Sequence, residues 1–407
     1  GRRPVDSTSR SDRGLTGIRR NFISLRAARR LLSHLAMQIR SIVLLGVLTT
    51  TDAFAAPVCS QGELFAGKAD FDDPMKRPVE GQDLHATPPL GWRSLVFAGD
   101  KLVTTVGQEI WYTDTKAAKP VLKRLAGKED RGGQASKPGT CANARFANIN
   151  GIAVMADGSL AGADQTANDI FIVKDPFGPG CAVSMIAGST KPIDGISPGS
   201  PPNVGDVDGP GATAKFKLPN WVAVAGGAIY FIDGGALKLK KVMPDAAHTV
   251  KTVAKLPEGV YYDLVALKDK LYMIGNNTTS EGFIIEVTPA GAVREVVRGR
   301  SDTWQGSGSI NVSGLATDGT GLFTTQSGQL LYVTLDGQVS SLAGTGASID
   351  FQGGYDLTKP HKAADLQIPS MRRVQTAGAN VFVGYKDGNV YYSGTLQTVY
   401  VEKIGCK

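Results

Sequence analysis

The stretch Val222-Ala-Val-Ala-Gly-Gly-Ala-Ile229 continues into Ile229-Tyr-Phe-Ile-Asp233, so a small apolar run meets a glycine turn and emerges into an aromatic run. Apolar and aromatic runs on both sides of a tight glycine turn are typical of a β-hairpin. After residue 55 the chain shows no long run with helical periodicity. This stretch therefore predicts an all-β fold.

The same strand, turn and strand unit recurs along the chain. Third and fourth strands follow most copies, as in Phe283-Ile-Ile-Glu-Val287 and Val293-Arg-Glu-Val-Val297. Repeats of four short strands are typical of propeller blades, and a sandwich would not explain such a repeat. The six copies begin at Leu95, Ile152, Val222, Leu264, Leu315 and Val374, which we call the anchors. We therefore predict a six-bladed β-propeller over residues 90–407.

Several blade ends carry a further motif. Leu125-Ala-Gly127 and Ile186-Ala-Gly188 end blades, and Asp208-Gly-Pro-Gly-Ala-Thr-Ala-Lys-Phe216 leads into the third blade. Together with Gly151-Ile-Ala-Val154, these motifs resemble those of NHL-repeat propellers. Blade four departs from the pattern, because it ends in Val297-Arg-Gly299. The resemblance implies a six-bladed propeller and little about chemistry.

The region before residue 56 has the features of a secretory signal peptide. Met37 is followed by Arg40, an apolar stretch over residues 42–48 and the small-residue triplet Ala53-Phe-Ala55. A short buried helix is the alternative. We predict a leader over residues 1–55, with the signal at about 37–55 and the upstream segment absent from the mature protein. The mature chain then begins near Ala56, residues 56–89 form an N-terminal extension, and the protein is secreted or periplasmic.

The formal charge of +7 is concentrated in that leader. Residues 1–55 carry ten Arg against three Asp, so the rest of the chain is balanced in charge. Binding to nucleic acid requires several neutralised phosphates, and a neutral body argues against such a partner. No apolar run approaches the roughly 18–20 residues that a membrane span requires.

The four cysteines all follow the predicted leader, in a compartment that permits disulfides. Three connectivities are possible. The spacing favours Cys141 with Cys181 and Cys59 with Cys406, and the second pair would tie the ends of the mature chain together. None of them has the spacing of a zinc site. Free thiols are the alternative.

Ligands of propellers bind at the mouth of the central channel, so the residues just before each anchor are the candidate site. Asn150, Asn220 and Asp263 offer the oxygen ligands that Ca²⁺ prefers, which makes calcium the one cofactor to consider. Two arginines at equivalent positions favour a small anionic ligand instead. Ordinary loop polarity is the third interpretation. The candidate ligand-binding residues are Arg93, Asn150, Asn220, Trp221, Tyr262, Asp263 and Arg372.

These features favour a binding or scaffold module over an enzyme. After the leader only His85, His248 and His361 remain, and the chain shows no G-x-S-x-G elbow between a strand and a helix. We therefore expect recognition of a ligand or protein partner at the channel mouth. The alternative is a metal-dependent hydrolase or lyase of the lactonase-like propeller type. The sequence does not determine the ligand or the oligomeric state.

Overall fold

The structure is a computed structural model, and it describes most of the chain after the predicted leader. Two three-residue 3-10 turns, Gly211–Thr213 and Ala363–Asp365, are the helices of this part, and neither is long enough to span a bilayer. The described residues are 56–67, 79–84, 94–128, 134–188, 193–196, 203–299, 313–326, 328–346, 359–368, 372–377, 379–385 and 400–407.

Six antiparallel sheets form the blades of a β-propeller, as the sequence predicts. Blade 1 consists of β2 (Leu95–Ala98), β3 (Lys101–Val106), β4 (Glu109–Asp114) and β5 (Lys123–Gly127). Blade 2 consists of β8 (Ile149–Val154), β9 (Leu160–Asp164), β10 (Asp169–Lys174) and β11 (Ala182–Gly188), with β7 (Gly139–Thr140) at its outer edge. Blade 3 consists of β13 (Pro219–Ala225), β14 (Ala228–Asp233), β15 (Lys238–Val242) and β16 (Val250–Lys255).

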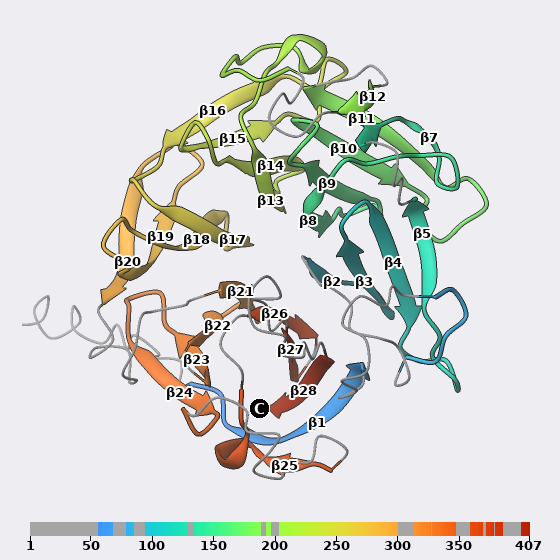
Figure 1. Cartoon of the computed structure of the whole chain (residues 1–407). Coiled ribbons are helices and arrows are strands. Elements are labelled where there is room, and N and C mark those ends of the chain that lie inside the picture. The colour runs from blue at the N-terminus through green and yellow to red at the C-terminus, as the bar shows by residue number, and fades with distance from the viewer. Residues whose placement is uncertain are drawn as a thin grey trace, which may run out of the picture. The chain divides into compact units, whose positions relative to one another are not determined.

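The second half of the ring repeats this pattern. Blade 4 consists of β17 (Val260–Leu267), β18 (Lys270–Asn276), β19 (Gly282–Val287) and β20 (Val293–Gly299). Blade 5 consists of β21 (Ser313–Thr317), β22 (Leu322–Gln326), β23 (Gln329–Val333) and β24 (Val339–Ala343). Blade 6 contains β26 (Arg372–Ala377), β27 (Asn380–Tyr385) and β28 (Tyr400–Cys406). The first strand of each blade lies innermost, around the centre of the ring (Figure 1).

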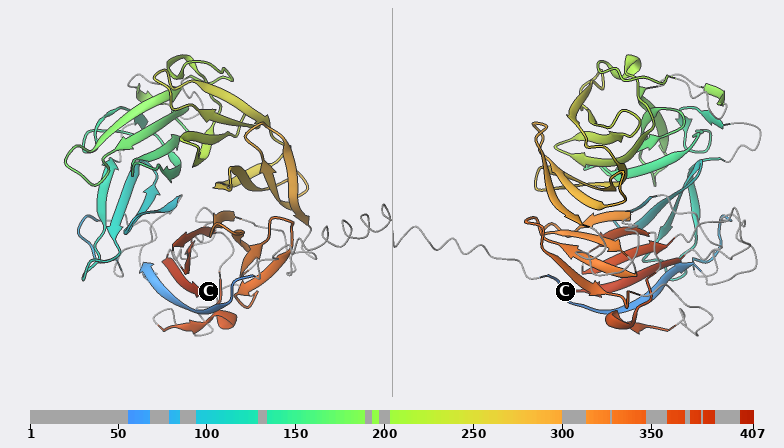
Figure 2. Two further views of the ribbon diagram at one scale, coloured as in Figure 1. Left: turned by 180° about the vertical axis from the view of Figure 1, so that it is seen from behind. Right: turned by 60° about the vertical axis from the view of Figure 1, so that its left-hand side comes forward.

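Blade 6 is completed by the other end of the described chain. Strand β1 (Cys59–Gly67) pairs antiparallel with β28, with Gly62 opposite Ile404, and β25 (His361–Lys362) covers the outer edge of β1. Figure 2 shows β1 beside β28 from behind and from the side. The sequence predicts a strand near residues 60–66 in this place. The pairing closes the ring and covers edges that an open propeller would expose.

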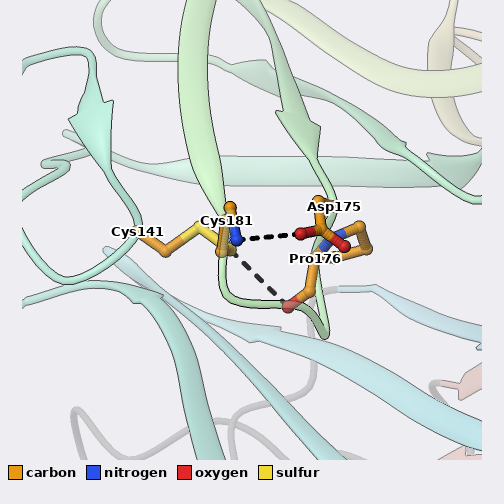
Figure 3. Close-up of a disulfide and its surroundings, with 5 residues drawn as sticks. Cys141, Asp175, Pro176 and Cys181 are labelled. Atoms are coloured by element: carbon orange, nitrogen blue, oxygen red, sulfur yellow. Dashed lines mark hydrogen bonds between the residues drawn. A yellow bond between two sulfur atoms is a disulfide. The ribbon is translucent and has the colours of Figure 1, made fainter.

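Both favoured disulfides are present. Cys59–Cys406 joins β1 to β28 inside the closing blade. Cys141–Cys181 ties the segment after β7 to the start of β11 (Figure 3), where the Cys141 amide also donates to the Cys181 carbonyl at 3.0 Å. Asp175 shapes the intervening loop, because its Oδ2 accepts a hydrogen bond of 2.9 Å from the Gly180 amide.

The hydrophobic core lies between neighbouring blades. One apolar cluster joins blades 2 and 3, where the rings of Phe216 and Phe231 meet at 4.8 Å between centroids. The next joins blades 3 and 4 and includes Tyr261 and Phe283, whose centroids are 5.4 Å apart. Similar clusters fill the other interfaces. Each blade therefore buries its two faces against its neighbours.

The Ala-Gly motif at the blade ends has a steric explanation. Gly188 ends β11 with a φ of +87°, in the left-handed region that favours glycine. A Cβ atom at this position would lie 2.2 Å from the carbonyl oxygen of Asn168. A residue with a side chain would therefore force the outer strand away from the start of β10.

Candidate functional site

The repeat places equivalent residues at one level around the channel. All six anchors are buried, with exposed fractions of 1–6%. Each anchor lies on the innermost strand of its blade. The residues before the anchors therefore lie at the same end of the channel, which we call the N-terminal end. The residues after the anchors line the channel wall.

A cavity of about 240 Å³ lies at the centre of the ring and is lined by the innermost strands of all six blades. Most of its wall consists of small apolar side chains. The described wall residues include one amide side chain, that of Gln375, and one carboxylate, that of Asp263. The apolar members beyond the anchors are Val96, Phe97, Ala153, Val154, Ala223, Val224, Val265, Ala266 and Ala316.

Polar groups at the N-terminal end of the channel join neighbouring blades. The Oγ of Ser94 in blade 1 accepts a hydrogen bond of 3.2 Å from the Ile152 amide in blade 2. Trp221 in blade 3 donates from Nε1 to the Tyr261 carbonyl in blade 4 at 2.7 Å. Trp221 is buried in the apolar cluster between blades 3 and 4 and is one of the residues that line the cavity.

Asp263 also lines the cavity, and its carboxylate joins blades 4 and 5. Its Oδ1 accepts from the Leu264 amide and its Oδ2 from the Leu315 amide, each at 2.9 Å. Both oxygens thus have a backbone donor. Carboxylates with such partners act mainly as structural links, because a new ligand must compete with hydrogen bonds already made.

Gly151 permits the close contact between blades 2 and 3. A Cβ atom at Gly151 would lie 2.9 Å from both Cα and N of Trp221. The two innermost strands therefore approach backbone to backbone at this level. The sequence places Gly151 in the ring of pre-anchor residues, but no local signal shows that it faces Trp221.

Three other predicted site residues, Asn150, Asn220 and Tyr262, are not among the residues that line the cavity. Asn150 is buried, and the Oδ1 of Asn220 is buried without a hydrogen-bond partner among the described residues. Tyr262 is half-buried, and burial raises the pKa of its hydroxyl. Arg372 begins β26, whereas Arg93 lies outside the described residues. The structure thus brings Trp221 and Asp263 together on the cavity wall, and the ligand and metal roles of the whole set stay predictions.

Within the described ranges, no three His, Cys, Asp or Glu side chains gather in a way that would hold a metal ion. Asp263 is the one carboxylate of the predicted calcium ligands, and its oxygens accept backbone hydrogen bonds. Calcium therefore remains a prediction from the residue types alone.

Two clusters of buried charge lie outside the channel, and sequence reasoning missed both as clusters. In blade 2, Asp164 and Asp169 face each other across β9 and β10, and both are fully buried. Asp164 accepts backbone hydrogen bonds from Ala147 at 2.6 Å and from Asn148 at 2.9 Å. Asp169 accepts one of 2.7 Å from the Ser136 hydroxyl, and burial beside Asp164 raises its pKa well above the usual value.

Ser136 belongs to a small sheet outside the blades. It ends β6 (Gln134–Ser136), which pairs with β12 (Ile193–Ile196). The Ser136 side chain is fully buried. Its hydrogen bond to Asp169 therefore fastens this two-stranded sheet to blade 2.

In blade 3 the buried cluster contains a cation. The Lys240 ammonium is fully buried and lies 2.7 Å from Asp206, 3.1 Å from Asp208 and 3.7 Å from Asp233. Asp233 also accepts a backbone hydrogen bond of 2.7 Å from Lys217, and burial raises its pKa to about 6. The lysine binds the loop before blade 3 to the middle of that blade.

The comparisons with known proteins support the fold alone. No family model matches the chain, and no curated protein matches it. The chain is similar to an auxiliary nutrient binding protein from Bacteroides thetaiotaomicron VPI-5482, with a TM-score of 0.56, 12% identity and coverage of 85% of this chain and 76% of that one. A protein of the same description from Bacteroides ovatus ATCC 8483 gives a TM-score of 0.53 at 10% identity, covering 86% and 77%.

A third similar structure is a protein of unknown function from Bacteroides thetaiotaomicron VPI-5482. Its TM-score is 0.53 at 12% identity, and the match covers 86% of this chain and 76% of that one. At such identities a structural likeness establishes architecture, because one fold carries many functions.

Proposed function

We propose that this protein is an exported propeller of NHL-repeat type that binds a ligand or protein partner at the mouth of its central channel. The cavity of about 240 Å³ carries the proposal, because residues from all six innermost strands line it. Concave, mostly apolar sites with a few polar groups are the usual binding sites of proteins. Two of the similar structures are described as nutrient binding proteins, which is the same class of function.

Export is supported by two independent features. The predicted signal over residues 37–55 has a basic start, an apolar centre and a small-residue cleavage triplet. The two disulfides Cys59–Cys406 and Cys141–Cys181 are typical of oxidising compartments. A fusion of residues 37–60 to a phosphatase that folds only outside the cytoplasm should give active enzyme, and Leu45→Arg within the apolar centre should abolish that activity.

The binding proposal is tested by blocking the channel. Ala266 lines the cavity and is half-buried, so Ala266→Trp places a large side chain at the cavity wall. A ligand at a hundred times its dissociation constant stabilises the native state by about 2.7 kcal/mol. A panel of sugars, amino acids and small acids should include compounds that raise the melting temperature of the wild type but not of the Ala266→Trp variant. Equal rises in both proteins would contradict binding in the channel.

The alternative function is a metal-dependent hydrolase or lyase. One observation favours it, since the buried Oδ1 of Asn220 lacks a hydrogen-bond partner among the described residues. Under this alternative, Ca²⁺ raises the melting temperature, a chelator reverses the rise, and Asn220→Ala removes it. A melting temperature that no metal changes would eliminate the calcium enzyme.

A further inference from the structure

The cavity wall combines apolar residues with a few polar groups. Blades 2 to 5 contribute apolar residues such as Ala153, Val224 and Val265, together with Trp221. The indole nitrogen of Trp221 already donates to Tyr261. The apolar residues of the wall suit hydrocarbon or an aromatic ring.

Blades 6 and 1 contribute hydrogen-bonding groups that retain capacity. Gln375 lies on β26 and Ser94 just before β2, and these strands are neighbours at the closure of the ring. The Nε2 of Gln375 makes a long hydrogen bond of 3.4 Å to the Thr376 carbonyl, and its Oε1 accepts none from the described residues. Ser94 accepts a hydrogen bond at Oγ, and its hydroxyl hydrogen stays available to donate.

The charge of the wall restricts the ligand further. Asp263 is the one charged group among the lining side chains that the structure describes, and both its oxygens accept backbone hydrogen bonds. An anion in the cavity would lie near this carboxylate without a cation on the described wall. A cation would find carboxylate oxygens that each already accept one backbone hydrogen bond. Either kind of ion would also lose part of its hydration against the apolar residues of the wall.

We propose, building on the function proposed above, that the cavity binds a small uncharged ligand with an apolar ring and one hydrogen-bonding edge. The ring lies against Trp221 and the small side chains of blades 2 to 5, and the polar edge meets Gln375 and Ser94. An apolar cavity of about 150 Å³ takes up benzene. The cavity of about 240 Å³ thus has room for one ring and a short polar substituent.

Three probes of similar size test the ligand class. Benzamide has the proposed chemistry, benzoate has the same shape with a negative charge, and glucose is polar on every side. Ligand-detected NMR on the purified protein should show benzamide binding at least tenfold more tightly than benzoate or glucose. Gln375→Leu should weaken benzamide three- to tenfold, because it removes one hydrogen bond and keeps the volume. Gln338→Leu on an exposed turn is the matched control and should change nothing.

Ala266→Trp separates the failure of this inference from that of the proposed function. If benzoate or glucose binds more tightly than benzamide and Ala266→Trp blocks it, the channel site stands and the uncharged class is overturned. If benzamide binds equally to Ala266→Trp and to the wild type, both proposals are overturned. If no probe binds at millimolar concentration, the ligand class is overturned, and the broader panel of the previous section decides the channel site. If Ala266→Trp fails to fold, Gln375→Leu alone decides, and unchanged benzamide affinity in that variant overturns the inference.

Discussion

Blades 2 and 3 carry an aspartate at the same place, the end of the second strand, and surround it with opposite chemistry. Asp164 and Asp233 each accept backbone hydrogen bonds from the segment that leads into the innermost strand. In blade 2 the cross-strand neighbour is a second acid, Asp169, whereas in blade 3 the nearby Lys240 supplies a positive charge. The repeat thus conserves the backbone link, and the charge around it varies from blade to blade.

The difference indicates how each blade holds its outer loop. Blade 2 uses contacts without a cation, namely the Ser136 hydroxyl that donates to Asp169 and the Cys141–Cys181 disulfide. Blade 3 uses ion pairs, with the buried Lys240 between partly exposed acids of the preceding loop and the buried Asp233 of its own sheet. A loop that is held by ion pairs depends on every charged partner, because a buried charge without its counterion costs several kcal/mol.

Lys240→Met should have the largest effect. The variant leaves Asp206, Asp208 and Asp233 without their shared buried cation, so we expect about 3–5 kcal/mol of destabilisation in urea unfolding at pH 7. Lys238→Met is the matched control, because Lys238 is partly exposed and pairs with Asp206 alone. That control should cost under about 1 kcal/mol. Equal losses of stability in the two variants would show that the burial of Lys240 does not make its ion pairs more important for stability than those of Lys238.

Removal of the blade 2 disulfide should follow in size. Cys141→Ser together with Cys181→Ser opens a link across 40 residues, for which we expect a loss of about 2–4 kcal/mol. Hydrogen exchange should quicken over residues 136–188 and remain unchanged over 219–255 of blade 3. Hydrogen exchange that quickens equally in both blades would contradict the idea that each blade holds its outer loop independently.

Asp169→Asn should change the pH dependence of stability. Burial raises the pKa of folded Asp169 well above its usual 3.8, so the unfolded chain releases this proton first as the pH rises. The stability from this group is complete below pH 3.8 and declines above it. The Asn variant cannot ionise and still accepts from Ser136, so its advantage over the wild type should grow as the pH rises above 3.8. Parallel stability profiles for the two proteins would refute the raised pKa of Asp169.

Asp233→Asn should change the stability by a smaller amount and over a narrower range of pH. Burial raises the pKa of Asp233 to about 6, so its contribution declines between pH 3.8 and about 6 and is constant above that. We expect the stability of the variant relative to the wild type to rise by on the order of 2 kcal/mol between pH 4 and pH 6. Urea unfolding of both proteins at intervals of half a pH unit measures this difference in stability. A change that continues to pH 8 would assign the titration to another group.

The fold was predictable because its signals are local. The strand before Ile229, the glycine turn and the strand after it stand together in the sequence, and the six anchors identified in this way are all buried. The cysteine pairing was predictable as a preference, since Cys59 and Cys406 stand near the ends of the predicted mature chain.

The sequence predicted the positions of two residues of the candidate site, but not the groups that they contact. Trp221 and Asp263 do line the cavity, yet nothing near them in sequence shows that Tyr261 and Leu315 occupy their hydrogen-bonding groups from neighbouring blades. The buried clusters were hidden for the same reason. Ser136 is 33 residues from Asp169, and Asp208 is 32 residues from Lys240. Such partners are set by the packing of loops, which has no periodic signal.

The closure of blade 6 has a consequence for the timing of folding. Strand β1 is synthesised before any blade, and its partner β28 is synthesised after blade 5. Contacts between residues so distant in sequence form slowly, because a long chain must be ordered before they are made. During synthesis β1 therefore lacks its partner strand until β28 has been made, and the ring cannot close before residue 406 has left the ribosome. The Cys59–Cys406 bond then joins covalently the two strands that close the ring.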